Sequence, residues 1–323
     1  MTDHVPFCVC VPVRNEQQRL PVLLAALAAQ DRPGKLPVAL CINNSTDGSI
    51  AVARTEAERW RDRLEIIIDL QVFPAYRAHA GAARRAAMAV GLVRLGARFG
   101  GVLVSTDADT RPPPTWLSAN LAALSAGADI VGGRLVLDDA EDAPAEGLAL
   151  SRIWDAYWRE VRCIEDALAP SPWDPPPRHG DHTGASLALT VQTYRSAGGV
   201  PEQPTGEDRA LVIAAQAQGA RLVHPMAVWT RVSPRTQGRA AEGMAEHMTR
   251  LFHQARTGDR VMAPDFSHWR RRAAWRRDLR REPETAGRLP VLESRLPPMP
   301  LDLDLRTWAG GAAHSGRRAG TAA

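Results

Sequence analysis

The sequence predicts an α/β protein with a mixed, mainly parallel sheet sandwiched by helices, followed by a helical C-terminal extension. In residues 1–140, short apolar runs alternate with helical patterns, which is typical of a parallel sheet with crossover helices. The 323-residue chain is 45% hydrophobic and 24% charged, as in soluble globular proteins. Beyond residue 240 the pattern becomes helical and rich in arginine.

The N-terminal elements follow from the spacing of apolar residues. Strands are expected where β-branched and apolar residues form short continuous runs, at residues 7–13, 38–42, 65–70, 101–105 and 129–137. Helices are expected where apolar residues recur three or four positions apart, at residues 17–29, 49–61, 79–95 and 114–125.

A different pattern begins near residue 145. Residues 146–169 form a long amphipathic helix pattern, and the proline-rich segment 170–182 excludes regular structure. Residues 184–190 again resemble a strand, and a helix is expected to begin near Glu207. Two short strands follow within 221–225 and 227–233, and residues 240–282 are expected to be helical.

Charge and composition exclude several classes of protein. No apolar run approaches the ~20 residues that span a bilayer, and the N-terminus has no basic region before its apolar stretch, so we expect a cytoplasmic protein. The net charge is only +4, and a nucleic-acid partner is not expected. The basic run at residues 268–282 is either a solvated face or a surface for an anionic partner such as the inner face of a membrane. Cys8, Cys10 and Cys41 lie in apolar runs and are expected to be free, buried thiols.

Polar residues follow three of the predicted strands. Arg14 and Glu16 follow the first strand, Asn43 follows the second, and Asp107 and Asp109 follow the fourth. In a doubly wound sheet, ligands bind outside the carboxyl ends of the strands. Two acids before a run of prolines are also ordinary turn residues. Their place at the strand's end favours a divalent cation site with positions open for a diphosphate.

Further candidates lie later in the chain or on helices. Glu207 and Asp208 precede a helix, where the helix dipole alone favours acids, and they are also placed to supply a general base. Arg84, near the start of a helix after Gly81, is placed to meet a phosphate. His182 either orients an acceptor or holds its own loop, and His224 is treated as structural rather than as a metal ligand.

Four segments in order resemble the motifs of family 2 glycosyltransferases, which have the GT-A (Rossmann-like) fold. They are VPVRNEQQRL, CINNSTDGS, STDADT and HTGASLALTVQTYRSAGGVPEQPTGEDRAL, and the resemblance covers roughly residues 5–235. It implies a GT-A domain at 1–239, with a nucleotide-binding half at 1–140 and an acceptor half at 141–239. A helical, basic extension at 240–309 and a disordered tail at 310–323 would follow.

The resemblance also implies roles for individual residues. Pro12, Arg14 and Glu16 would line the nucleotide pocket, Asn43 would face the nucleobase, and Arg84 would meet the base or diphosphate. Asp107 would contact the ribose or the metal, Asp109 would bind the metal, and Asp208, with Glu207 beside it, would deprotonate the acceptor. Asn43 replaces the usual aspartate of its motif, which leaves the choice between uracil and guanine open.

The implied reaction is transfer of a sugar from a nucleotide-diphosphate sugar, assisted by Mg²⁺ or Mn²⁺ and inverting at the anomeric carbon. The acceptor would be a carbohydrate, a lipid-linked molecule or a small molecule. The Gln-x-x-Arg-Trp motif of membrane-bound synthases is missing, so a processive polysaccharide synthase is not expected. A sugar-phosphate nucleotidylyltransferase and a non-catalytic nucleotide-sugar-binding protein are the alternatives.

Overall fold

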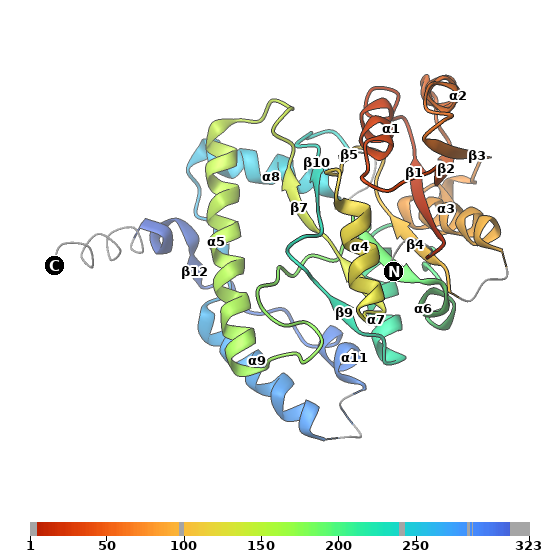
Figure 1. The fold of residues 1–323 in the computed structure, drawn as a ribbon. Coiled ribbons are helices and arrows are strands. Elements are labelled where there is room, and N and C mark those ends of the chain that lie inside the picture. The colour runs from red at the N-terminus through yellow and green to blue at the C-terminus, as the bar shows by residue number, and fades with distance from the viewer. Residues whose placement is uncertain (1–4, 97–99, 239–242, 283–284, 286, 311–323) are drawn as a thin grey trace, which may run out of the picture. The chain divides into compact units, whose positions relative to one another are not determined.

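The computed structural model describes residues 5–96, 100–238, 243–282, 285 and 287–310 of the protein (Figure 1). The chain divides into two compact units. Unit 1 contains the N-terminal part up to Glu141 and the later segment Pro177–Pro234, whereas unit 2 contains Asp142–Pro176 and the part that begins at Met244. The segment predicted as the acceptor half, 141–239, is therefore shared between the units. Apart from Gly310, the tail predicted to be disordered lies outside the described residues.

The main sheet of unit 1 has seven strands in the order β3-β2-β1-β4-β8-β6-β9. Strands β1, β2, β3 and β4 are mutually parallel, while β8 pairs antiparallel with both β4 and β6. The predicted α/β fold with a mixed, mainly parallel sheet is confirmed. The strands are β1 (Phe7–Val13), β2 (Leu36–Asn43), β3 (Leu64–Gln71), β4 (Val102–Ser105), β6 (Ile130–Gly132), β8 (Leu187–Thr190) and β9 (Leu222–Val223).

Helices cover both faces of this sheet because side chains of a strand alternate between its faces. Val9, Val11 and Val13 of β1 share a core with α1, α2 and α4, whereas Cys8 and Cys10 share the opposite core with α3, α6 and α7. The helices are α1 (Leu20–Ala28), α2 (Ser49–Arg59), α3 (Ala80–Leu95), α4 (Trp116–Ser125), α6 (Val191–Ser196) and α7 (Glu207–Ala217). A short 3₁₀ helix, η1 (Ala75–Arg77), precedes α3.

The predicted free thiols are confirmed, since Cys8, Cys10 and Cys41 are buried and unpaired by disulfides. Gly91 lets α3 approach β1 at this point, because a Cβ there would lie 2.6 Å from the Cys10 sulfur.

The prediction of one strand over residues 129–137 is wrong. The segment splits into β6 in the main sheet and β7 (Arg134–Leu137) in a second sheet of order β5-β10-β7. The break falls at Gly133, where a Cβ would overlap the Ser186 hydroxyl and where the N–H donates to the Ser186 carbonyl at 2.9 Å. This close backbone approach turns the chain out of the main sheet. The partners of β7 are β5 (Thr110–Arg111) and β10 (Trp229–Val232).

Unit 2 is mainly helical. Its elements are α5 (Ala145–Leu168), α8 (Met244–Thr257), β11 (Met262–Ala263), α9 (Phe266–Arg281), α11 (Leu289–Ser294) and β12 (Leu303–Asp304). The stretch 240–282, expected to be helical, is divided: α8 ends at Thr257 before Gly258, whose φ is +73°, and α9 starts at Phe266 after the short strand β11. Asp265 caps α9 by accepting a hydrogen bond from the Ser267 N–H at 2.8 Å.

Tyr157 of α5 lies at the centre of unit 2 and is fully buried. Its ring packs against Trp154, Trp158 and Phe266 at centroid distances of 5.7, 5.2 and 5.3 Å. Its hydroxyl donates to the Pro264 carbonyl at 2.8 Å. The aromatic residues of α5 therefore form a core around Tyr157.

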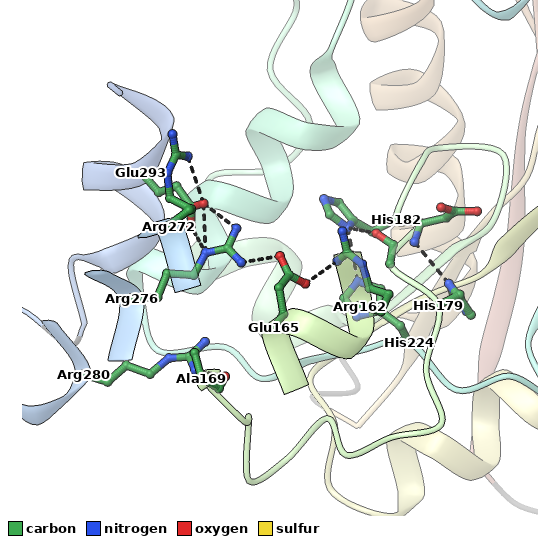
Figure 2. Close-up of polar contacts among 12 residues, drawn as sticks. Arg162, Glu165, Ala169, His179, His182, His224, Arg272, Arg276, Arg280 and Glu293 are labelled. Carbon is green, nitrogen blue, oxygen red and sulfur yellow. Dashed lines mark hydrogen bonds and ion pairs between the residues drawn. The ribbon is translucent and has the colours of Figure 1, made fainter. Parts of the chain in front are cut away.

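The basic helix α9 directs several arginines into unit 2. Figure 2 shows Arg276 between Glu165 and Glu293, and its Nη1 lies 2.5 Å from Glu165 Oε1. Arg280 Nη1 donates to the Ala169 carbonyl at 2.7 Å. Part of the basic run is thus a structural network rather than a solvated face. In the described part of the chain, no helix combines the length and apolar character needed to cross a bilayer.

Candidate active site

The loops that follow β1 and β2 interlock at the carboxyl edge of the main sheet. The Asn15 N–H donates to Ser45 Oγ at 3.0 Å, and the Thr46 N–H donates to Asn15 Oδ1 at 2.7 Å. The Glu16 N–H donates to Ser49 Oγ at 2.8 Å. The Asp47 side chain, just before α2, accepts from the Ser49 N–H at 3.0 Å. These bonds hold the two strand ends as one rigid edge.

Four of the predicted donor-binding residues lie on this edge. Pro12 is partly exposed near the end of β1, and Arg14 Nη1 donates to the Ala78 carbonyl at 2.8 Å. Glu16 and Asn43 are buried, with 7% and 2% of their surface exposed. Because β1 and β2 are neighbouring parallel strands, these residues come together as predicted.

The sequence reasoning missed a role for Asn44. Its φ of 45° is in the left-handed region, which asparagine tolerates better than most residues. Its side-chain amide donates to the Phe73 carbonyl at 2.9 Å and its Oδ1 accepts from the Phe73 N–H at 3.1 Å. Asn44 thus fastens the end of β2 to the segment after β3. The sequence signal for this role is the pair Asn43–Asn44 at the end of a strand, because asparagine tolerates a left-handed φ.

Arg84 of α3 connects three segments of unit 1. Its Nε donates to Glu207 Oε1 at 2.9 Å, and its Nη2 donates to Asp107 Oδ1 at 2.8 Å. Its Nη1 donates to Ser105 Oγ at 2.7 Å and to the Gly184 carbonyl at 2.9 Å. Although the helix start was expected to face a phosphate, the guanidinium is buried and directed at protein groups.

The charge of Arg84 is maintained by its acidic neighbours. Burial lowers the pKa of the guanidinium, but the attraction of Asp107, Glu207 and Asp208 outweighs that effect. The resulting pKa lies above the ordinary value for arginine, so the side chain is a permanent cation at this point of the site.

Gly184 provides the space for this cation, and the sequence reasoning did not single it out. A Cβ at Gly184 would overlap Cζ and Nη2 of Arg84 and would lie 2.7 Å from its Nε. The Gly184 N–H donates to Asp208 Oδ2 at 2.7 Å. One glycine therefore contacts Arg84 through its carbonyl and Asp208 through its amide.

The two predicted catalytic acids differ in their surroundings. Glu207 is 4% exposed and its carboxylate pairs with Arg84. Asp208 is partly exposed, and its Oδ1 accepts from the Arg209 N–H at 2.7 Å. Of the two, Asp208 is the carboxylate that solvent can reach to a substantial degree.

Asp107 and Asp109 lie in a tight turn at the end of β4. The Thr110 side chain donates to the Asp107 carbonyl at 2.9 Å, so the expected turn is present. Both acids are partly exposed, and one oxygen of Asp107 is engaged by Arg84. Two such carboxylates suit Mg²⁺ or Mn²⁺, which complete their coordination with water and phosphate. Among the residues that the structure describes, no group of three or more His, Cys, Asp or Glu side chains is arranged for a metal ion.

Three histidines of unit 1, His179, His182 and His224, contact one another. His182 Nδ1 lies 3.2 Å from His224 Nε2, and the rings of His179 and His224 have centroids 5.6 Å apart (Figure 2). His179 and His224 are buried. Their mutual packing agrees with the structural role expected for His224.

Comparison with known proteins identifies the class of protein to which residues 8–157 belong. Residues 8–157 match the family model described as Glycosyl transferase family 2. Residues 8–157 therefore form a family 2 glycosyltransferase domain, which confirms the predicted family and enzyme class for this part of the chain. No protein with a curated description matches the sequence.

Two solved structures are similar to this chain at low sequence identity, and the first of them, with a TM-score above 0.5, has the same fold. The mannosyltransferase PcManGT from Pyrobaculum calidifontis, in complex with GDP-Man and Mn²⁺, is 20% identical, with a TM-score of 0.52. The match covers 97% of this chain and 81% of that chain. S. aureus TarS 1–349 in complex with UDP-GlcNAc is 16% identical over 82% of this chain and 69% of that chain, with a TM-score of 0.49.

Proposed function

We propose that the protein transfers a sugar from a nucleotide-diphosphate sugar to an acceptor hydroxyl, with inversion and with Asp208 as general base. The observation that carries the proposal is the convergence on Arg84 of the two acidic segments. Asp107 belongs to the predicted metal turn, and Glu207–Asp208 begin the helix of the predicted base. The Mn²⁺ and GDP-Man bound by the related mannosyltransferase support a metal-assisted nucleotide donor.

Asp208 is suited to receive a proton. Its two oxygens each accept one backbone N–H, from Gly184 and Arg209, at 2.7 Å. These bonds orient the carboxylate and leave further lone pairs for the acceptor hydroxyl. As the acceptor oxygen attacks the anomeric carbon, its proton passes to Asp208 and the bond to the diphosphate oxygen breaks.

The donor would lie along the carboxyl edge of the sheet, with Pro12, Arg14, Glu16 and Asn43 around the nucleotide. A divalent cation held by Asp107 and Asp109 would neutralise the leaving diphosphate as a Lewis acid. Asn43 both donates and accepts hydrogen bonds, so uracil and guanine donors are both tested.

Thermal-shift and calorimetric binding of UDP-, GDP- and dTDP-sugars, with and without Mn²⁺, tests donor and metal together. We expect one donor class to stabilise the protein in a cation-dependent way, and Asp109→Ala to lose that dependence. Unchanged Mn²⁺-dependent affinity in Asp109→Ala would contradict the metal site. No stabilisation by any donor would contradict the nucleotide-sugar proposal. Conversion of the donor to a nucleoside triphosphate and a sugar 1-phosphate, only when pyrophosphate is added, would indicate a nucleotidylyltransferase.

The base is tested by Asp208→Asn, with Asp62→Asn as a matched control on an exposed aspartate. We expect Asp208→Asn to keep its donor affinity and to lose about 10²–10⁴-fold in kcat. The control should change neither quantity. A kcat near that of the unaltered protein would remove Asp208 from the base role.

For peripheral contact with an anionic membrane, α9 offers the exposed Arg270, Arg271 and Arg281. We expect sedimentation with phosphatidylserine vesicles at low salt, and its loss in the variant Arg270→Glu/Arg271→Glu. Equal sedimentation with neutral vesicles would contradict an electrostatic contact.

A further inference from the structure

We infer that Arg84 is a positioning residue of sugar transfer, which holds the Asp107 turn and the base Asp208 in one fixed arrangement instead of binding the donor. This inference rests on the proposed function, because it assigns Arg84 a task within that reaction. It also departs from the role in donor binding that the sequence motif implies for this arginine.

The hydrogen bonds of Arg84 leave little capacity for a phosphate. A guanidinium has five N–H donors in a fixed planar fork. The Arg84 guanidinium donates four hydrogen bonds of 2.7–2.9 Å, to Glu207, Ser105, Gly184 and Asp107. The residue is 4% exposed. The fork is therefore occupied by the protein's own groups.

Arg84 acts on Asp208 through Gly184. The Gly184 carbonyl accepts from Arg84, and the N–H of the same residue donates to Asp208 Oδ2. Glu207, the residue before Asp208, is held by Arg84 Nε at the start of α7. Two routes thus tie the orientation of Asp208 to one guanidinium.

The same guanidinium reaches the donor side through Asp107 and Ser105 at the end of β4. Reaction requires the acceptor oxygen and the anomeric carbon to meet in a narrow range of geometry, and a shift of about 1 Å can cost ~10²-fold in rate. Because Arg84 fixes the position of Asp107 relative to Asp208, its loss should lower kcat more than it weakens donor affinity.

The first experiment compares Arg84→Lys with Arg85→Lys. Lysine keeps the charge but lacks the planar fork. Arg85 is the neighbouring residue on α3, and its side chain is 44% exposed. For Arg84→Lys we expect kcat to fall about 10–100-fold while the calorimetric Kd for nucleoside diphosphate with Mn²⁺ changes less than about threefold. The control should match the unaltered protein. An unchanged kcat in Arg84→Lys, together with an about 10–100-fold weaker affinity for the nucleoside diphosphate, would overturn the inference.

A second pair of variants separates positioning from folding. Arg84→Gln leaves the buried Glu207 carboxylate unpaired and should lower the melting temperature. The double variant Arg84→Gln/Glu207→Gln removes both charges and should regain much of that stability. We expect its kcat to stay at least about tenfold low, because the fork is still missing. Recovery of both stability and kcat would show that Arg84 only balances charge.

Hydrogen exchange at the Gly184 amide provides a readout that needs no substrate. This amide donates to Asp208, and Arg84→Lys should speed its exchange about tenfold or more, unlike Arg85→Lys. Unchanged exchange in Arg84→Lys would overturn the inference. Failure of the unaltered protein to bind any nucleotide diphosphate would instead overturn the proposed function, so the two failures are distinguishable.

Discussion

Gly184→Ala is the smallest substitution that should disrupt the proposed active site. An added methyl group at this position would occupy the space of the Arg84 guanidinium, since it would overlap Cζ and Nη2 and lie 2.7 Å from Nε. These three atoms belong to a side chain that is itself held by four hydrogen bonds. Arg84 must therefore leave its partners, or the Gly184 segment must move away from Asp208.

The cost can be worked from the groups that lose partners. Breaking a buried ion pair and leaving one charge behind costs about 3–5 kcal/mol, which applies here because Glu207 is 4% exposed. Replacing glycine by alanine returns roughly 0.4–1 kcal/mol through the unfolded chain. The free energy of unfolding should therefore fall by about 2–4 kcal/mol, and kcat should fall with it.

Urea denaturation and steady-state kinetics measure both effects, with Gly100→Ala as the control. Gly100 has no neighbouring atom within 4 Å of its Cβ position and no left-handed φ, so it should tolerate alanine. The Gly184→Ala cost should also shrink in an Arg84→Lys background, where the bulky fork is gone. Unchanged stability and unchanged kcat in Gly184→Ala would refute the packing of Arg84 against Gly184.

Three further predictions concern unit 2. Tyr157→Phe should lower its stability by about 2–3 kcal/mol in urea denaturation, because the Trp269 Nε1–H and a backbone carbonyl lose a buried partner. Burial raises the pKa of the Tyr157 hydroxyl from 10.0 to about 12, so the folded state holds this proton more tightly than the unfolded state. Its contribution should be complete below pH 10 and fall by roughly 3 kcal/mol by pH 12, a loss that melting temperatures of the Tyr157→Phe variant should not show. Arg276→Met should cost about 2–4 kcal/mol because it weakens the pairing of the buried Glu165, whereas Arg277→Met, at a 42% exposed side chain, should cost less than about 1 kcal/mol in the same assay.

The sequence predicted the sheet because its strands carry their own periodic signal. Residues 7–13 are the whole of β1, and the other early strands lie within one or two residues of their expected ends. The segment 129–137 failed for a physical reason. A continuous apolar run does not reveal that Gly133 must pass close to Ser186, more than fifty residues later.

The sequence predicted which residues belong to the candidate site, but it did not predict the contacts between them. Asp107, Asp109 and Asp208 were singled out from motifs, and their roles stay predictions. Arg84 was expected to face a phosphate because the local pattern shows only a helix start after a glycine. Its partners Gly184 and Glu207 lie 100 and 123 positions away, and nothing local specifies them.

The sequence by itself determined the fold class, the glycosyltransferase family and the polar residues at the strand ends, because periodicity and motifs are local properties of the chain. Only the tertiary structure decided that Arg84 joins Asp107 to Glu207, that Gly184 connects it to Asp208, and that α5 belongs to a unit with α8 and α9. Such pairings depend on which distant segments pack together, and burial then requires each charged group to find its partner.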